Sequence, residues 1–297
     1  MPNALRNSLP EVSSLVLFIS SSLFAVFIST IVLSVEPSVA PSSSTSGLLY
    51  IAYYLVAAVV FSAVIIVLSK RFKMNFLKWI FIALIGFMVF YVWSYVGALI
   101  AQTYLEYYVM VIGAPLIIMA LLVVKREWYV IDIAGFFLCA GLASILGTIL
   151  GIWAAVIFLA AFAVYDYISV YKTKHMVSLA KVAVDAELPM LFIFPNNTSE
   201  KLGKVELTDE GVEGHKAMLL GFGDIAFPGI MVVASAIYGY SVGHPLEFIL
   251  LPLLGGIAGM MLLVTGKIKK PAPGLPFLNT GVILGFLACF LYFTFVL

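Results

Sequence analysis

Long apolar runs separated by short polar stretches dominate the pattern along the chain. A helix that crosses a bilayer needs about 20 predominantly apolar residues. Nine runs have about that length, and we expect one membrane domain over 1–297, with six helices in 13–171 and three in 216–297. The sequence therefore predicts an all-α, polytopic membrane protein with nine transmembrane helices. Their expected ranges are 13–35, 47–69, 79–101, 104–124, 130–149, 151–171, 217–240, 247–265 and 275–296.

The basic residues give this bundle an orientation. All 16 Lys and Arg residues precede the first helix or fall between helices two and three, four and five, six and seven, or eight and nine. With nine helices these positions share one side of the membrane, which the positive-inside rule makes cytoplasmic. We therefore expect a cytoplasmic N-terminus, a cytoplasmic loop over 172–215 and a C-terminus outside.

Composition narrows the class of protein further. With 63% hydrophobic and 10% charged residues, the chain is not an ordinary soluble domain. Its net charge of +1 gives no reason to expect a nucleic-acid partner. The expected environment is the lipid bilayer.

Two carboxylates lie well inside membrane-length segments. Asp166 is near the end of the sixth predicted helix, and Asp224 is near the start of the seventh. A charge at such depth costs roughly 2.5–3.5 kcal/mol on insertion scales. At the helical rise, Asp166 is about 9 Å from Lys172, and Asp224 is about 12 Å from Lys216. Antiparallel helices would therefore place both acids at similar depth, where two acids can share a proton and activate water.

Acids inside a membrane have a second common use, in the proton and ion pathways of transporters. A proton- or cation-coupled carrier, or an ion-leak protein, is therefore an alternative function for the same pair. The paired broken helices of an inverted-repeat carrier are not evident in the sequence. The sequence also has no HExxH or GxSxG motif, which argues against a membrane metalloprotease or serine protease. We expect neither a metal site nor an organic cofactor.

Short motifs surround the two acids. Tyr165 directly precedes Asp166, and its ring is a candidate border of a substrate cleft, with packing against lipid as the alternative. Asp224 follows a segment whose two glycines would let another backbone approach the acid. The candidate residues of that segment are Gly221, Phe222 and Gly223.

A proline-rich motif, PGLP, lies at the start of the last predicted helix, on the same side as the acids. It comprises Pro273, Gly274, Leu275 and Pro276. The prolines predict irregular backbone here, which survives at membrane depth only when buried in protein or lining an aqueous cavity. Such a backbone could pair with an unwound substrate, and a plain helix start is the alternative.

The three motifs YD, GFGD and PGLP resemble the YD, GxGD and PAL motifs of the presenilin and signal peptide peptidase family of intramembrane aspartyl proteases. The order of the motifs and the helices that carry them agree, so the resemblance covers the whole chain. It implies that Asp166 and Asp224 are a catalytic dyad, that PGLP shapes the active site, and that substrates are transmembrane helices of other proteins. A prepilin-type peptidase, which also uses a GxGD acid, is a further alternative that YD and PGLP disfavour.

Some features are particular to this chain. Gly274 stands where the family usually has the alanine of PAL, and we expect Gly274→Ala to be tolerated or mildly activating. The compact sequence resembles a microbial member of the family, which predicts the cell membrane of a prokaryote. Whether it forms a homo-oligomer is left open. The apolar stretch 188–194 is expected to pack on the bundle, with a place at the membrane interface or a self-cleavage site as alternatives. Gly255 and Gly259 are expected to serve helix packing.

Overall fold

The computed structural model describes residues 2–39, 53, 74–125, 127–169, 189–195, 207–208, 211–212, 217–265 and 273–295. Within these ranges a short 3₁₀ helix, η1 (Pro37–Val39), follows the first of eight α-helices. Apart from Tyr53, the second predicted helix, 47–69, lies outside the described residues. The α-helices are α1 (Pro2–Val35), α3 (Met74–Ile100), α4 (Tyr104–Val124), α5 (Trp128–Leu150), α6 (Ile152–Ile168), α8 (Phe222–Val242), α9 (Pro245–Thr265) and α10 (Gly274–Phe295).

Seven of these helices are long and apolar enough to cross a membrane, and α6 is a shorter apolar helix of 17 residues. At the helical rise, 17 residues span about 26 Å, slightly less than the bilayer core. Gly151, with a φ of 70°, makes the turn between α5 and α6, a conformation that favours glycine. The described chain is therefore a polytopic membrane fold, as the sequence predicts.

The strands correct the all-α prediction. β1 (Leu191–Pro195) pairs with β4 (Ala217–Gly221) as an antiparallel ribbon, and β2 (Leu207–Thr208) pairs with β3 (Gly211–Val212). Consequently the predicted helix 217–240 is wrong at its start, because its first five residues form β4. A short apolar run is compatible with a strand and with a segment of a buried helix, so the hydropathy of 217–221 could not distinguish the two structures.

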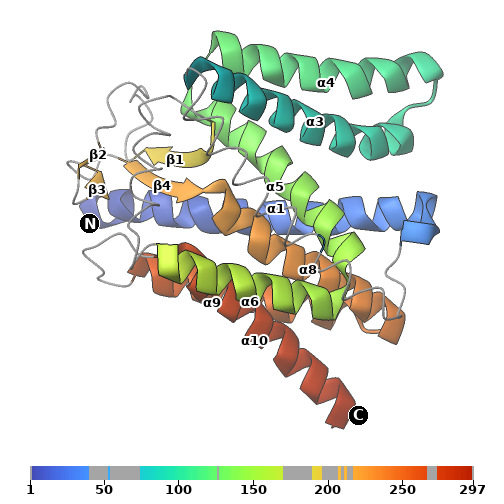
Figure 1. Ribbon diagram of the computed structural model, residues 1–297, viewed down its shortest axis with the longest axis vertical. Coiled ribbons are helices and arrows are strands. Elements are labelled where there is room, and N and C mark those ends of the chain that lie inside the picture. Colours follow the sequence, from blue (N-terminus) through green and yellow to red (C-terminus); the bar gives the residue numbers. More distant parts are fainter. Residues whose placement is uncertain are drawn as a thin grey trace.

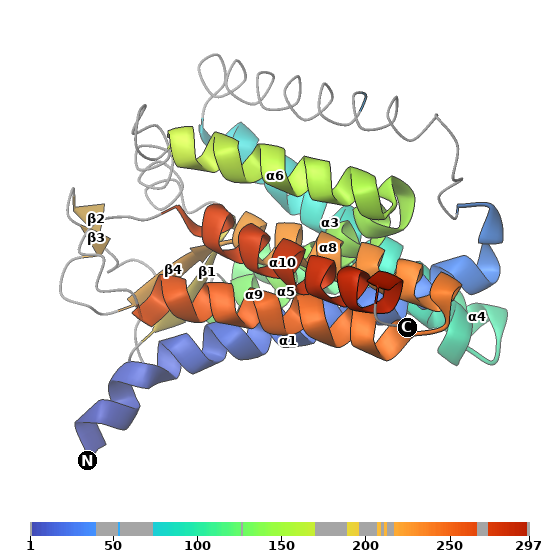
Figure 2. The same ribbon diagram turned by 90° about the horizontal axis from the view of Figure 1, so that it is seen from below.

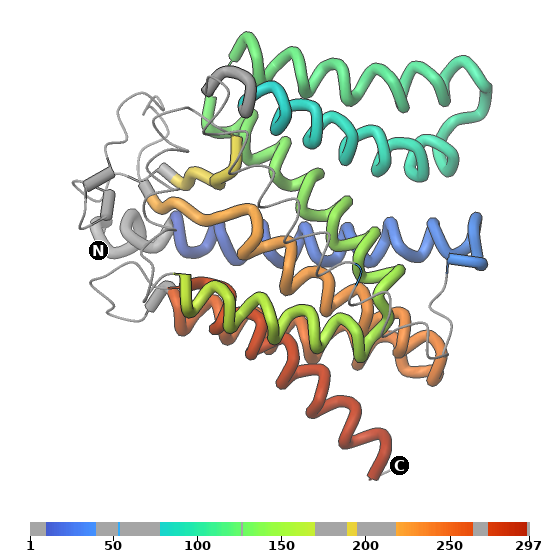
Figure 3. The backbone as a smooth tube through the Cα atoms, in the orientation of Figure 1, coloured from blue at the N-terminus to red at the C-terminus, as the bar shows by residue number. Residues whose placement is uncertain are grey.

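The helices form a bundle around α5 and α8 (Figure 1). α5 packs against α1, α3 and α8, while α10 packs against α6, α8 and α9. α3 and α4 form a hairpin along one side, and the β1–β4 ribbon lies at the same end of the bundle as the start of α1 (Figures 1 and 2). The start of α1 and the end of α10 lie at opposite ends of the bundle (Figure 1), and Figure 3 traces the same backbone as a tube.

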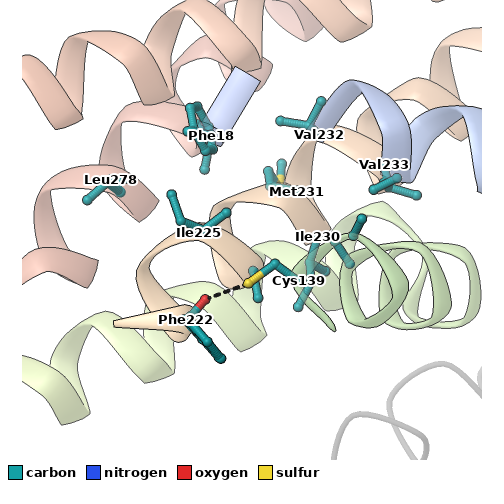
Figure 4. Packing of buried hydrophobic residues seen from close by; sticks show 14 of the residues in the cluster. Phe18, Cys139, Phe222, Ile225, Ile230, Met231, Val232, Val233 and Leu278 are labelled. Carbon is teal, nitrogen blue, oxygen red and sulfur yellow. Dashed lines mark hydrogen bonds between the residues drawn. The ribbon is translucent and has the colours of Figure 1, made fainter. Parts of the chain in front are cut away.

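The core is centred on α8, whose residues are buried on nearly every side (Figure 4). Ile225 and Met231 of α8 are buried with Phe18 of α1 and Leu278 of α10. α4, in contrast, exposes many large apolar side chains, as expected of a helix that faces lipid.

Glycines allow α9 and α10 to pack closely. A Cβ atom at Gly255 would collide with the carbonyl of Gly281, and one at Gly259 would collide with that of Phe277. The packing role expected for Gly255 and Gly259 is therefore confirmed. This contact fixes the position of α10, whose first turn carries the PGLP motif.

Candidate active site

Asp224 occupies the first turn of α8, directly after the β1–β4 ribbon. β4 ends at Gly221, which is the N-cap of α8, and the Gly221 N–H donates a 3.2 Å hydrogen bond to Oδ2 of Asp224. The side chain is half-buried. Because Ala217–Gly221 is a strand, the helical rise does not apply between residues 216 and 224, so the distance expected between Lys216 and Asp224 loses its helical basis. The end of α6, which carries Asp166, and the start of α8, which carries Asp224, nevertheless lie at the end of the bundle where the ribbon is (Figures 1 and 2).

Asp166 lies near the end of α6 and is only 2% exposed. Its Oδ2 accepts a 3.2 Å hydrogen bond from the backbone N–H of Leu275. Its Oδ1 is buried and has no hydrogen-bond partner within the part of the chain that the structure describes. One oxygen of this carboxyl group is therefore fixed by α10.

The backbone of PGLP is more regular than the sequence predicts. α10 begins at Gly274, so Leu275 and Pro276 lie in its first turn and only Pro273 precedes the helix. The prediction of irregular backbone is wrong from Gly274 onward, because the first N–H groups of a helix lack intrahelical acceptors and Pro is tolerated there. The same shortage of acceptors explains why the Leu275 N–H is available to Asp166.

Gly274 lies against Asp224. A Cβ atom added at Gly274 would be 2.7 Å from Oδ1 and 2.9 Å from Cγ of Asp224, closer than real Cβ atoms approach. An alanine at 274 would therefore require the Asp224 carboxyl group to shift, so this geometry argues against the expectation that Gly274→Ala is tolerated, which remains to be measured. Two adjacent residues at the start of α10 thus contact both acids.

Asn279 is a polar residue of the site region that the motifs did not identify. It is fully buried one turn after Leu275, and its Nδ2 donates a 3.0 Å hydrogen bond to the Leu159 carbonyl of α6. α10 is therefore joined to α6 at two levels, by Asn279 and by the bond from Leu275 to Asp166. In the sequence, Asn279 could have been noticed as a polar amide side chain within the apolar run 275–296.

The residues next to the acids have different environments from those expected. Tyr165 is 63% exposed, and its ring lies edge-on to Phe162 rather than in the buried surroundings of Asp166. Phe222 is buried against Phe192, with ring centroids 4.5 Å apart, so it packs the core. A Cβ atom at Gly223 would meet only the Phe227 ring, at 3.2 Å. The close backbone approach to Asp224 therefore comes from Gly274 on α10.

Comparison with known proteins agrees with this geometry. The family described as "Signal-peptide peptidase, presenilin aspartyl protease" matches residues 15–295. The chain belongs to this family. Among curated proteins, none is significantly similar to the chain.

Solved structures extend the comparison to the fold. A presenilin family intramembrane aspartate protease in a C222 crystal form is 27% identical, with a TM-score of 0.63, over 94% of this chain and 97% of that one. A presenilin family intramembrane aspartate protease in a P2 crystal form is 28% identical, with a TM-score of 0.56, over 92% and 95%. This presenilin-family protein is accordingly a multi-pass membrane protein and an intramembrane aspartyl endopeptidase that acts on transmembrane substrates.

Proposed function

We propose that Asp166 and Asp224 are the catalytic pair of this protease. The observation that carries the proposal is their shared contact with the start of α10. Leu275 donates its N–H to Asp166, while Gly274 lies against the Asp224 carboxyl group. These two acids come from different helices and are 58 positions apart in the sequence (224 − 166). Family membership and this convergence support the same pair.

The proposed chemistry is general acid–base hydrolysis of a peptide bond. One carboxylate takes a proton from a water held between the acids, and the other, protonated, acid polarises the scissile carbonyl. The water oxygen adds to the carbonyl carbon to give a gem-diol, which collapses with protonation of the leaving amine. The pair titrates as a unit, so either acid can be written in either role.

The substrate proposed is a transmembrane helix of another protein. A helix hides its carbonyls in its own hydrogen bonds, so it must unwind locally before a water can attack. PGLP is helical from Gly274 and offers no strand for pairing there. The extended backbone beside Asp224 is β4, whose edge away from β1 suits an unwound segment.

We propose the finer topology on the basis of charge. Nine helices in a single membrane domain, 1–297, would put all 16 basic residues, the N-terminus and the 172–215 loop in the cytoplasm and the C-terminus outside. The start of α1 and the end of α10 lie at opposite ends of the bundle in Figure 1, which supports an odd number of crossings. We also propose a prokaryotic cell membrane as the location, on the compact, microbial character of the sequence.

The experiment that tests the function uses purified protein, reconstituted with a single-helix membrane substrate. Mass spectrometry should find two products whose junction lies inside the apolar segment of the substrate. Asp224→Asn should give none, while the matched change Glu247→Gln, at an acid of α9 that is about half exposed, should cleave normally. A carrier that uses the acids would instead conduct ions in vesicles and yield no peptides.

A further inference from the structure

Asp132 is a buried carboxylate near the start of α5, and the proposed chemistry does not use it. It is the fifth residue of α5 and is 8% exposed. Its Oδ1 accepts a 3.0 Å hydrogen bond from the backbone N–H of Ile193, the central residue of β1. Being only two residues inside the predicted helix 130–149, it did not stand out as a deep acid in the sequence. The structure shows a buried acid that binds a strand.

The register of the ribbon shows which way the Ile193 N–H points. The Phe222 N–H donates to the Met190 carbonyl at 3.2 Å, so these two residues form a hydrogen-bonded pair just beyond the ends of the strands. Hydrogen-bonded and non-hydrogen-bonded pairs alternate along an antiparallel ladder. Ile193, which faces Leu219, is therefore in a non-hydrogen-bonded pair, and its N–H points away from β4. Asp132 satisfies this donor at the outer edge of β1.

The other edge of the ribbon is linked to the proposed catalytic pair. Gly221 faces Leu191, also in a non-hydrogen-bonded position, and its N–H donates to Asp224. No residue separates the end of β4 from the start of α8. Each edge of the ribbon thus binds one carboxylate, Asp132 on the β1 side and Asp224 on the β4 side.

Packing on the same face of α5 reinforces the link. The Phe192 and Phe222 rings fill the space beside Gly135, where a Cβ atom would be 2.6 Å from Phe222 and 2.7 Å from Phe192. One turn further, the Cys139 thiol donates a 3.2 Å hydrogen bond to the Phe222 carbonyl (Figure 4). Asp132, Gly135 and Cys139 are spaced three and four residues apart, so they share one helix face. That face holds both β1 and the first residue of α8.

We propose that Asp132 is a positioning residue that holds the β1–β4 ribbon on α5 and thereby sets the position of Asp224. The proposal rests on Asp224 belonging to the catalytic pair. Asp132 acts as a hydrogen-bond acceptor and does not touch the reacting atoms. An unpaired strand N–H in apolar surroundings is unfavourable, so loss of the acceptor releases the centre of β1. A side chain of the same shape that keeps an acceptor oxygen should be sufficient.

Two substitutions separate this role from simple packing. Asp132→Asn keeps the shape and the acceptor, whereas Asp132→Leu keeps a similar volume without the acceptor. With a transmembrane substrate, Asp132→Asn should have kcat and KM close to those of the wild type. Asp132→Leu should lower kcat by on the order of 100-fold, with little change in KM, because a misplacement of about 1 Å can have that effect. Hydrogen exchange at 191–195 should accelerate in Asp132→Leu only.

The same bond can be removed from its other side. Ile193→Pro deletes the donor but no β1–β4 ladder bond, since this N–H faces away from β4. Ile193→Val, which keeps the donor, is the matched control. The losses in kcat from Asp132→Leu and Ile193→Pro should be strongly non-additive in the double variant, because both remove one bond. If Asp132→Leu does not fold, Ile193→Pro should show the loss in kcat by itself.

Three results would overturn the proposal. The first is an Asp132→Asn variant as inactive as Asp132→Leu, which would mean that the ionisable group itself is required. The second is wild-type kcat in Asp132→Leu or, where that variant does not fold, in Ile193→Pro. The third is additive losses in the double variant. The Asp224→Asn variant is measured in parallel. If this variant is active, the assignment of the catalytic pair is wrong. Hydrogen exchange at Ile193 still decides whether Asp132 holds the ribbon.

Discussion

Gly274 and Asp224 are in such close contact that a Cβ atom at residue 274 would be 2.7 Å from Oδ1, so the carboxyl group would have to shift to admit a side chain there. The glycine is the first residue of α10, and the acid is in the first turn of α8. The next residue, Leu275, donates its N–H to Asp166. The start of α10 therefore sets the relative position of both acids.

The first prediction concerns this contact. Gly274→Ala should fold normally but cleave more slowly, by on the order of tenfold, because the Asp224 carboxyl group must shift from its position. The measurement is kcat for a transmembrane substrate together with a thermal unfolding curve. Gly113→Ala on α4 is the matched control, since nothing lies within 4 Å of a Cβ atom there. Equal kcat in the Gly274→Ala variant and the wild type would show that the contact has no catalytic consequence.

The second prediction concerns the prolines of PGLP. Replacing both Pro273 and Pro276 by alanine should let α10 extend toward its N-terminus, because each alanine restores a backbone N–H and removes the ring. The Leu275 N–H would then bond the carbonyl four residues earlier in place of Asp166. We expect cleavage to fall by on the order of 100-fold in a folded protein.

A single change provides the control for that experiment. Pro276→Ala alone leaves Pro273 to end the helix, so it should cleave nearly as fast as the wild type. If the double variant cleaves at the wild-type rate, PGLP has no role in the active site and is only the start of a helix.

The third prediction concerns the contact between α9 and α10. Gly255→Ala should lower the free energy of unfolding by about 1–3 kcal/mol, because its Cβ atom would collide with the Gly281 carbonyl. Cleavage should fall with it, since the shift moves the first turn of α10. Gly113→Ala again isolates the effect of the added methyl group. An unfolding curve unchanged from that of the wild type would contradict the packing.

The fourth prediction concerns topology. Cysteines introduced at Ser8 and Leu297 should react with an impermeant reagent from opposite sides of a sealed vesicle. The native Cys139 and Cys289 are buried, so they should contribute little background labelling. Labelling of both introduced positions from the same side would refute the odd number of helices.

Apolar length and isolated carboxylates are local signals, so the sequence predicts most of the described helices and identifies Asp166 and Asp224 as candidates. It failed at 217–221, where pairing with 191–195 made a strand of residues whose hydropathy fits a helix. It missed the role of Asp132, because its partner Ile193 is 61 positions away. The contacts of Gly274 and Leu275 are likewise tertiary, as Leu275 lies 109 positions from Asp166. Spacing along one chain carries no information about such contacts.

The measurement that tests the catalytic pair most directly compares cleavage rates of Asp166→Asn, Asp224→Asn and the double variant, each shown to be folded by its unfolding curve. If the acids share one proton, each single change removes the whole acid–base system, so all three rates should fall equally, by on the order of 100- to 10,000-fold. A folded single variant that cleaves near the wild-type rate, or a double variant much slower than either single variant, would contradict the pair.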